Sequence, residues 1–153
     1  MKWIKRIMTL SFILLFWGCA TERPIEKPPE KLLSTKEAAE TYLNRGVANS
    51  QKGEYKGAIS NYSKAVEIDP GFVVAYLNRG YTYSRLGEHE KAISDYNKAI
   101  ELNPRYAIAY NNRGFVYRKM GEYDKAIADF TKAIELDPKY ATAYYNRGNI
   151  RWC

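Results

Sequence analysis

Apolar and aromatic side chains recur at intervals of three and four residues along the middle of the chain. Val74, Leu77 and Tyr81 form one such run, and Ile108 and Phe115 belong to a second run that lies 34 residues further on. Side chains at these intervals share one face of an α-helix. A Gly-Glu pair follows each run and a proline follows the next helical stretch, so the pattern predicts pairs of helices.

The whole pattern has a period of 34 residues. An Asn-Arg-Gly sequence marks the first helix of every copy, and a proline ends the second helix of each complete copy. The members are Asn44, Asn78, Asn112 and Asn146; Arg45, Arg79, Arg113 and Arg147; Gly46, Gly80, Gly114 and Gly148; and Pro70, Pro104 and Pro138. One helix pair cannot bury its apolar face alone, so a fixed period of this length predicts stacked pairs.

Counted from residues 39, 73, 107 and 141 as position 1, the copies carry an aromatic residue at position 4 and Ala-x₃-Tyr or Ala-x₃-Phe in their second half. These residues are Tyr42, Tyr76, Tyr110 and Tyr144, then Ala58 with Tyr62, Ala92 with Tyr96, and Ala126 with Phe130. With the Asn-Arg-Gly variant, the pattern resembles the tetratricopeptide repeat family. The resemblance implies an all-α, right-handed superhelical solenoid of antiparallel helix pairs. Its repeats would span 35–72, 73–106 and 107–140, and 141–153 would supply the first helix of a fourth.

Two recurring residues invite structural hypotheses. Glycine within a helix costs about 1 kcal/mol relative to alanine, so Gly46 is expected to allow close approach to the second helix near Ala58. Arg79 is expected to pair with Asp95, and Arg113 with Asp129, which would align the two helices of each repeat. The alternative is an arginine that extends its alkyl chain over a solvated face.

Positions 2, 5, 9 and 12 of the first helices line the concave groove in this family, so the resemblance implies that a protein or peptide partner binds there. The predicted partner-binding residues are Val74, Leu77, Tyr81, Ile108, Asn111, Phe115, Arg118 and Tyr145. Arg85, Arg118 and Lys119 form one rim of this surface. Exposed apolar surface indicates an interaction site. Alternatively, positions 5 and 9 pack against the neighbouring first helices.

The best-known ligand of the family is the C-terminal carboxylate of chaperones, which is held by a clamp of asparagine and lysine residues. The position-6 asparagines match that clamp. Its lysines belong at positions 2 and 5, where this chain has Leu43, Val74, Leu77, Ile108 and Asn111. We therefore do not expect this clamp here.

The N-terminus has the features of a bacterial export signal. Three cations precede the apolar stretch from Ile7 to Trp17, which is too short to span a membrane, and Gly18-Cys19 follows it. The junction resembles the lipobox of bacterial lipoproteins, in which the cysteine is acylated. Residues 1–18 would then be a signal peptide, with Cys19 the lipidated N-terminus. An uncleaved signal anchor and ordinary cleavage remain alternatives.

Residues 19–34 follow as a linker rich in proline and charge, which would hold the fold away from the membrane. Lipoproteins of enteric bacteria carry Asp after the cysteine when they stay in the inner membrane. Ala20 therefore favours the outer membrane, facing the periplasm. At the end of the linker, Ser34 and Glu37 match a helix-capping box, so the first helix should begin near Thr35.

Charge and composition narrow the function further. The formal net charge is +7, but removal of residues 1–18 leaves 21 − 17 = +4, and residues 39–140 hold 15 basic and 13 acidic residues. That balance does not support nucleic-acid binding. One histidine and two cysteines argue against metal sites and disulfide frameworks. We find no phosphate-binding loop or nucleophile–base pair and expect no cofactor and no small-molecule substrate.

These observations favour a non-enzymatic, membrane-anchored scaffold or adaptor of the bacterial cell envelope. The fourth repeat stops within its first helix at Cys153. An alternative is therefore the N-terminal part of a larger envelope protein with an enzymatic or effector domain beyond that residue, and a third is a decayed gene. Full-length sequence would separate them.

Overall fold

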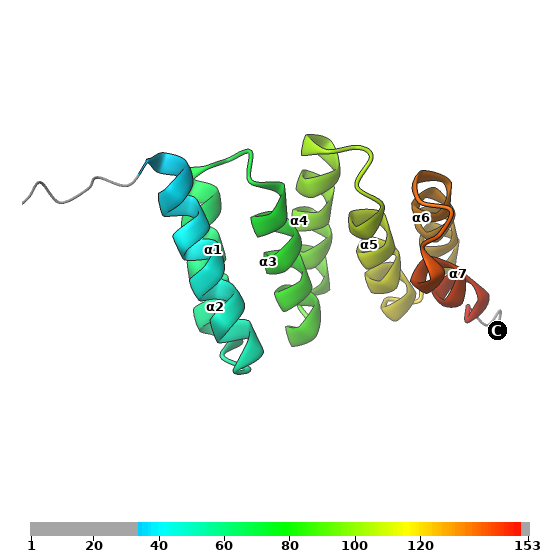
Figure 1. The fold of residues 1–153 in the computed structure, drawn as a ribbon. Helices are drawn as coiled ribbons and strands as arrows, with labels where there is room; N and C mark the ends of the chain where they lie inside the picture. The colour runs from blue at the N-terminus through cyan, green and yellow to red at the C-terminus, as the bar shows by residue number, and fades with distance from the viewer. Residues whose placement is uncertain (1–33, 151–153) are drawn as a thin grey trace, which may run out of the picture. The chain divides into compact units, whose positions relative to one another are not determined.

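The structure is a computed structural model that describes residues 34–150, and Figure 1 shows its course. This part of the chain consists of helices and contains no β-strand. The helices are α1 (Thr35–Gln51), α2 (Tyr55–Ile68), α3 (Val73–Leu86), α4 (His89–Leu102), α5 (Ala107–Lys119), α6 (Tyr123–Leu136) and α7 (Ala141–Gly148). The all-α prediction is therefore confirmed.

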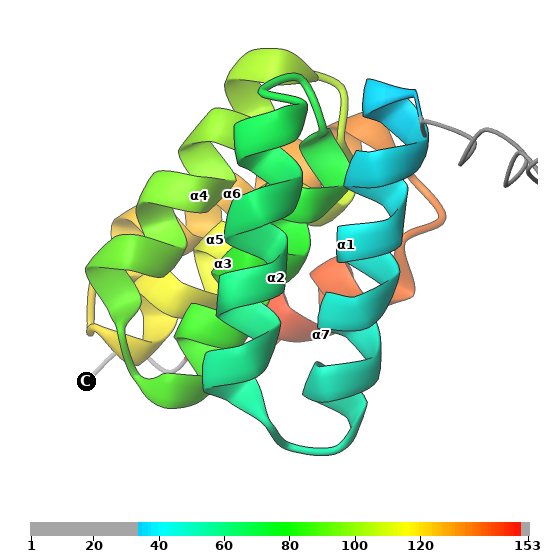
Figure 2. The same ribbon diagram turned by 90° about the vertical axis from the view of Figure 1, so that its left-hand side faces the viewer.

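The helices form consecutive pairs in chain order. Helix α1 packs against α2, α3 against α4, and α5 against α6, while each second helix also packs against the first helix of the next pair. Figure 1 shows the pairs standing in a row, and Figure 2, which looks along that row, shows successive pairs rotated relative to one another. This arrangement is the predicted solenoid of helix pairs.

Local sequence signals set the ends of the helices. The Ser34 hydroxyl accepts the Glu37 backbone N–H, and the Glu37 carboxylate accepts the Ser34 N–H, so α1 begins at Thr35 as predicted. The turn within each complete pair needs a backbone that only glycine adopts easily, with φ of 80°, 79° and 79° at Gly53, Gly87 and Gly121.

Each second helix ends at an aspartate or asparagine that precedes a proline. The side-chain oxygens of Asp69, Asn103 and Asp137 accept the backbone N–H two residues further on, at 2.9, 3.2 and 3.0 Å. The proline disfavours a helical conformation at the residue before it, and the side-chain bond stabilises the turn that follows.

Small and aromatic residues alternate in the buried layer between paired helices. Tyr62, Tyr96 and Phe130 are almost fully buried there. A Cβ atom built on Gly46 would lie 2.5 Å from Cε1 of Tyr62, so the ring lies across the glycine. The atoms nearest to the Cβ position of Gly46 thus belong to the Tyr62 ring, and close approach of Gly46 to Ala58 itself stays a prediction. A Cβ atom built on Gly80 would lie 3.2 Å from the carbonyl oxygen of Ala92 and would also meet the Tyr96 ring.

The predicted arginine–aspartate pairs are present. Arg79 donates to Asp95 through Nε at 2.8 Å and Nη2 at 2.7 Å, and Arg113 forms the same two bonds with Asp129. Only 17% of the Arg79 side chain is exposed. The alternative of an arginine on a solvated face is therefore wrong for these two residues.

The membrane-related predictions fall outside this part of the chain. The signal peptide 1–18, Cys19 and all of the linker except Ser34 lie outside the described residues. Within residues 34–150, none of the helices combines the length and the apolar character that a membrane span requires.

Candidate functional site

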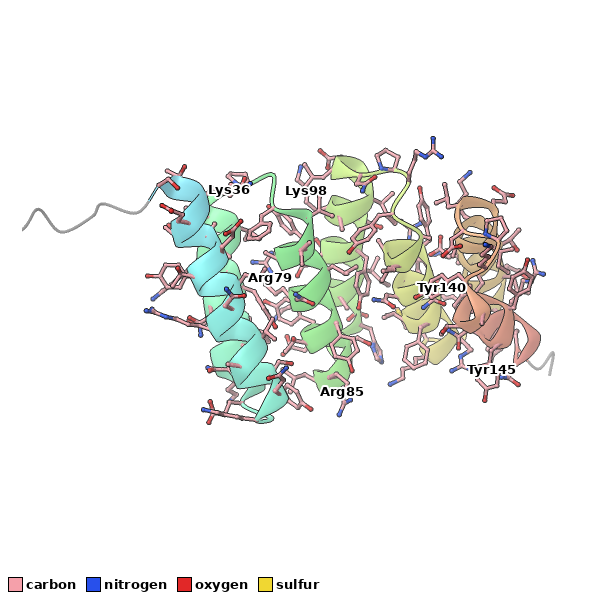
Figure 3. All side chains as sticks on the ribbon, viewed as in Figure 1. Lys36, Arg79, Arg85, Lys98, Tyr140 and Tyr145 are labelled. Carbon is pink, nitrogen blue, oxygen red and sulfur yellow. The ribbon has the colours of Figure 1, made fainter. Side chains whose placement is uncertain are left out.

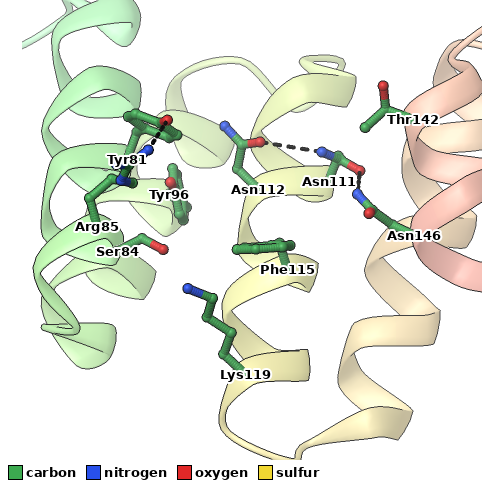
Figure 4. Close-up of a pocket in the computed structure, with 10 residues that line it drawn as sticks. All are labelled: Tyr81, Ser84, Arg85, Tyr96, Asn111, Asn112, Phe115, Lys119, Thr142 and Asn146. Atoms are coloured by element: carbon green, nitrogen blue, oxygen red, sulfur yellow. Dashed lines mark hydrogen bonds between the residues drawn. The ribbon is translucent and has the colours of Figure 1, made fainter. Parts of the chain in front are cut away.

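A cavity of about 460 Å³ opens between the first helices of the second, third and fourth repeats. We call it the α3–α5–α7 pocket. Its lining consists of Tyr81, Ser84, Arg85, Tyr96, Asn111, Asn112, Phe115, Lys119, Thr142 and Asn146. Figure 4 shows these side chains coming from α3 on one side, α5 in the middle and α7 on the other, with Tyr96 added from α4. The framework of helix pairs therefore places residues from three repeats around one space.

Three asparagines connect α5 to α7 beside this pocket. Asn146 donates through Nδ2 to Oδ1 of Asn111 at 2.9 Å, and Asn111 donates to Oδ1 of Asn112 at 3.3 Å (Figure 4). Asn111 is only 4% exposed, so its amide needs these partners. The bond from Asn146 to Asn111 links α7 to α5. All three asparagines line the pocket, and the bonds do not use the Nδ2 group of Asn112 or the Oδ1 atom of Asn146.

The pocket walls combine aromatic rings with cations. The Lys119 ammonium lies 5.1 Å from the centroid of the Phe115 ring. Arg85 donates to the hydroxyl of Tyr81 at 3.4 Å and to the hydroxyl of Tyr55 at 3.1 Å. The hydrogen bond with Tyr81 is the main reason that the pKa of Arg85 is raised, and a guanidinium stays protonated in proteins in any case. These contacts orient both cations without neutralising them.

A second, smaller hollow of about 290 Å³ lies on the other side of Tyr81 and Arg85, between α1, α2 and α3. Its lining residues are Val47, Ser50, Gln51, Tyr55, Tyr62, Asn78, Tyr81 and Arg85. We call it the α1–α3 pocket. Tyr81 and Arg85 line both spaces, so the two neighbouring pockets share these residues as a common wall.

The eight predicted groove residues have different environments. Tyr81, Asn111 and Phe115 line the α3–α5–α7 pocket. Val74, Ile108 and Tyr145 are exposed but lie outside its lining, and the guanidinium of Arg118 lies 5.1 Å from the Phe115 ring centroid. Leu77 is only 8% exposed and belongs to the hydrophobic core. Leu77 therefore follows the alternative for position 5, which was packing between neighbouring helices.

Sequence reasoning missed a set of contacts that join neighbouring repeats. Arg79, Arg113 and Arg147 each donate through Nη1 to a polar side chain on the second helix of the preceding repeat. The acceptors are Ser63 at 3.0 Å, Asn97 at 2.6 Å and Thr131 at 3.3 Å. All three acceptors occupy position 25, so a polar residue at that position in each complete copy was the available signal.

The described residues hold no group of three or more histidine, cysteine, aspartate or glutamate side chains that could bind a metal ion. His89, which replaces a tyrosine of the other repeats at position 17, is half-buried, and its Nδ1 has no hydrogen-bond partner. The chemistry that the described surface offers is therefore recognition through aromatic rings, amides and two cations.

Several solved structures are similar to this chain. The first repeat domain of Spaghetti (RPAP3), bound to the HSP90 peptide SRMEEVD, has a TM-score of 0.72 and 30% identity, with 74% of this chain and 90% of that chain covered. The Arabidopsis OM64 TPR domain has a TM-score of 0.73 and 26% sequence identity, with 75% of this chain and 95% of that chain covered. The second TPR domain of human RPAP3, in complex with the HSP70 peptide SGPTIEEVD, has a TM-score of 0.75 and 25% sequence identity. The similarity covers 78% of this chain and 100% of that chain.

The comparison with family models agrees with these structures, while no curated protein matches the chain. A tetratricopeptide repeat model matches residues 107–140, and a second model described as TPR repeat matches residues 50–87 and 83–121. Together these matches run from residue 50, at the end of α1, to residue 140, and so cover the second helix of the first repeat and all of the second and third repeats. The chain belongs to the tetratricopeptide repeat family.

Proposed function

We propose that this protein is a lipid-anchored adaptor of the bacterial cell envelope, which binds a segment of a partner protein along the α3–α5–α7 pocket. The observation that carries the proposal is Tyr81, which lines both pockets while 47% of its surface remains exposed. A large aromatic side chain in such a position is available to a partner, and buried aromatic anchors dominate many protein interfaces. The module would act by binding and not by catalysis.

Two similar domains support a peptide as the bound species. The first repeat domain of Spaghetti (RPAP3) holds an HSP90 peptide, and the second domain of human RPAP3 holds an HSP70 peptide. The lysines of the chaperone clamp are missing from this chain at Leu43, Val74, Leu77, Ile108 and Asn111. We therefore propose the same mode of segment binding with a different partner.

The location in the envelope rests on the sequence at the N-terminus. The Gly18-Cys19 junction after the apolar stretch supports acylation of Cys19, and more than one acyl chain gives stable membrane attachment. Ala20 favours the outer membrane. The linker 19–34 would give the repeats reach into the periplasm.

Photo-crosslinking in a bacterial host tests the proposal. The full chain would carry a photoreactive phenylalanine derivative in place of Tyr81, or in place of Lys98 as the matched control. Figure 3 shows Lys98 at the upper edge of the molecule and the pocket cation Arg85 at the lower edge. We expect a discrete crosslinked envelope protein from position 81 and not from position 98. Identical products from both positions, or no product from position 81, would contradict the proposal.

A further inference from the structure

From the second repeat onward, charge is distributed unevenly between the first and the second helices. Helices α3, α5 and α7 contain no aspartate or glutamate, whereas α4 and α6 contain both. The cations of the three first helices are Arg79, Arg85, Arg113, Arg118, Lys119 and Arg147. Asp95 and Asp129 reach across from the second helices and neutralise two of them, Arg79 and Arg113. The face made by α3, α5 and α7 therefore keeps an excess of positive charge.

The two pockets collect part of that excess. Arg85 and Lys119 line the α3–α5–α7 pocket, Arg85 also lines the α1–α3 pocket, and neither lining contains a carboxylate. The four lysines of α4 and α6 each pair with a glutamate, as Lys98 does with Glu101 at 2.7 Å. By contrast, Arg85 donates only to neutral tyrosine hydroxyls. A charge held in this way is available to a bound anion.

We propose that the α3–α5–α7 pocket binds an internal acidic segment of a partner protein. An aspartate or glutamate side chain of that segment accepts hydrogen bonds from Arg85 and Lys119, and an adjacent apolar side chain packs against Phe115 and Tyr81. The proposal rests on the proposed function and specifies the chemistry of the partner. Charge complementarity supports it, because both pockets offer cations and aromatic rings but no acidic group.

The position of Arg85 between two neighbouring pockets argues for an internal segment. Tyr81 and Arg85 lie at the boundary where one pocket meets the other. In the proposed mode the bound segment crosses Arg85 and occupies both pockets, so the carboxylate at that point belongs to a side chain and not to a chain end. Position 13 of the first helix supplies both Arg85 and Lys119, whereas the chaperone clamp draws its lysines from positions 2 and 5.

A peptide library provides the test. Random 12-residue peptides would be displayed at the N-terminus of a phage coat protein, so that no peptide has a free carboxyl end, and selected on the full lipid-anchored chain in nonionic detergent. We expect selected peptides to be enriched in aspartate or glutamate next to an apolar residue. Loss of one hydrogen-bonded charge pair costs about tenfold in affinity or more. A synthetic selected peptide with an amidated end should therefore bind the double variant Arg85→Gln/Lys119→Gln at least about tenfold more weakly.

The double variant Lys98→Gln/Lys132→Gln is the matched control, because it removes the same charge from α4 and α6. Its affinity should stay within about twofold of the unmodified chain, since screened charges far from a site contribute little. An equal loss in this control would overturn the inference in favour of nonspecific attraction. A requirement for a free carboxyl end would overturn it in favour of a terminal clamp.

Two further outcomes separate this inference from the proposed function. Selected peptides without acidic enrichment, which still lose affinity when Phe115→Ala is introduced, overturn the acidic preference and leave segment binding intact. Failure to select any peptide also overturns the inference. The proposed function is then decided by the crosslink from position 81, which does not depend on charge.

Discussion

Arg79 and Asp95 form a two-point contact, with Nε–Oδ2 and Nη2–Oδ1 distances of 2.8 and 2.7 Å. Two parallel bonds of this kind fix the relative orientation of both side chains. The third nitrogen of the same guanidinium donates to Ser63, so Arg79 connects α3 to α4 within its repeat and to α2 of the preceding repeat. The arginine therefore stabilises both the packing of the two helices within its repeat and the packing of neighbouring repeats.

Arg79→Gln should lower the free energy of unfolding by about 2–4 kcal/mol, because it leaves the buried carboxylate of Asp95 without its partner. Arg45→Gln is the matched control at the same repeat position. Asn61 replaces the aspartate there, and Arg45 is exposed, so its loss should cost less than about 0.5 kcal/mol. Urea denaturation of both variants checks the difference. Equal costs would show that the ion pair does not stabilise the fold.

Gly46→Ala should destabilise the protein by up to about 2 kcal/mol. The added methyl group would lie 2.5 Å from the buried ring of Tyr62, and overpacking of about 1–3 kcal/mol exceeds the gain of about 1 kcal/mol in helix propensity. At Gly148, the same substitution meets no atom within 4 Å among the described residues, so Gly148→Ala should be neutral or stabilising. Thermal unfolding followed by circular dichroism measures both. A stabilised Gly46→Ala would mean that the ring can move away.

Tyr81→Ala should weaken partner binding by about 2 kcal/mol and change the melting temperature little, because its side chain is exposed. Phe130→Ala should lower the free energy of unfolding by about 3–5 kcal/mol, because that ring is fully buried. Calorimetry with the partner identified by crosslinking measures the change in binding, and thermal melts measure the change in stability. If Tyr81→Ala lowers the melting temperature as much as Phe130→Ala, Tyr81 serves packing and not recognition.

Stability at high pH should depend on Tyr96. Burial is the main cause that raises the pKa of Tyr96, and the charge of Asp95 raises it further. Since the pKa in the folded state exceeds the unfolded value of about 10, the stabilisation is fully present below that pH and is lost as pH rises towards the folded pKa. Between pH 9 and 11 the unmodified chain should lose about 1 kcal/mol more than Tyr96→Phe, as measured by urea denaturation. Equal losses would show that Tyr96 ionises as readily in the fold as in the unfolded chain.

Cys19→Ala should move the protein from the membrane fraction to the soluble fraction, or leave its precursor uncleaved, because acylation needs the thiol. Fractionation and intact-mass analysis of the mature chain check this result. Ser11→Ala is a suitable control, since it alters the apolar stretch and not the junction. A cleaved chain with an unmodified Cys19 would exclude a lipid anchor.

The sequence predicted the helix pairs because their signals are local and repeat three times. The capping box at Ser34, the glycine turns such as Gly87 and the prolines that follow each second helix define the pairs without tertiary information. The pairing of Arg79 with Asp95 could also be predicted, since both residues recur one period later as Arg113 and Asp129.

The groove was harder to predict because exposure depends on the distance between neighbouring pairs. Leu77 and Tyr81 lie on the same helical face, yet Leu77 is buried and Tyr81 is exposed. Asn111 is buried because Asn146, 35 residues later, satisfies its amide, a contact that helical periodicity alone does not reveal. The stacking bonds from Arg79 to Ser63 were missed for the same reason, since they join different repeats.

Helix α7 supplies one wall of the α3–α5–α7 pocket through Thr142 and Asn146, while Asn146 also holds the amide of Asn111. The pocket is therefore complete only in molecules in which α7 is docked. For any ligand of this pocket, the apparent dissociation constant is the intrinsic one divided by the docked fraction. Mutations on the packing face of α7 will consequently change affinity without touching the ligand, and a bound ligand will slow amide exchange along α7.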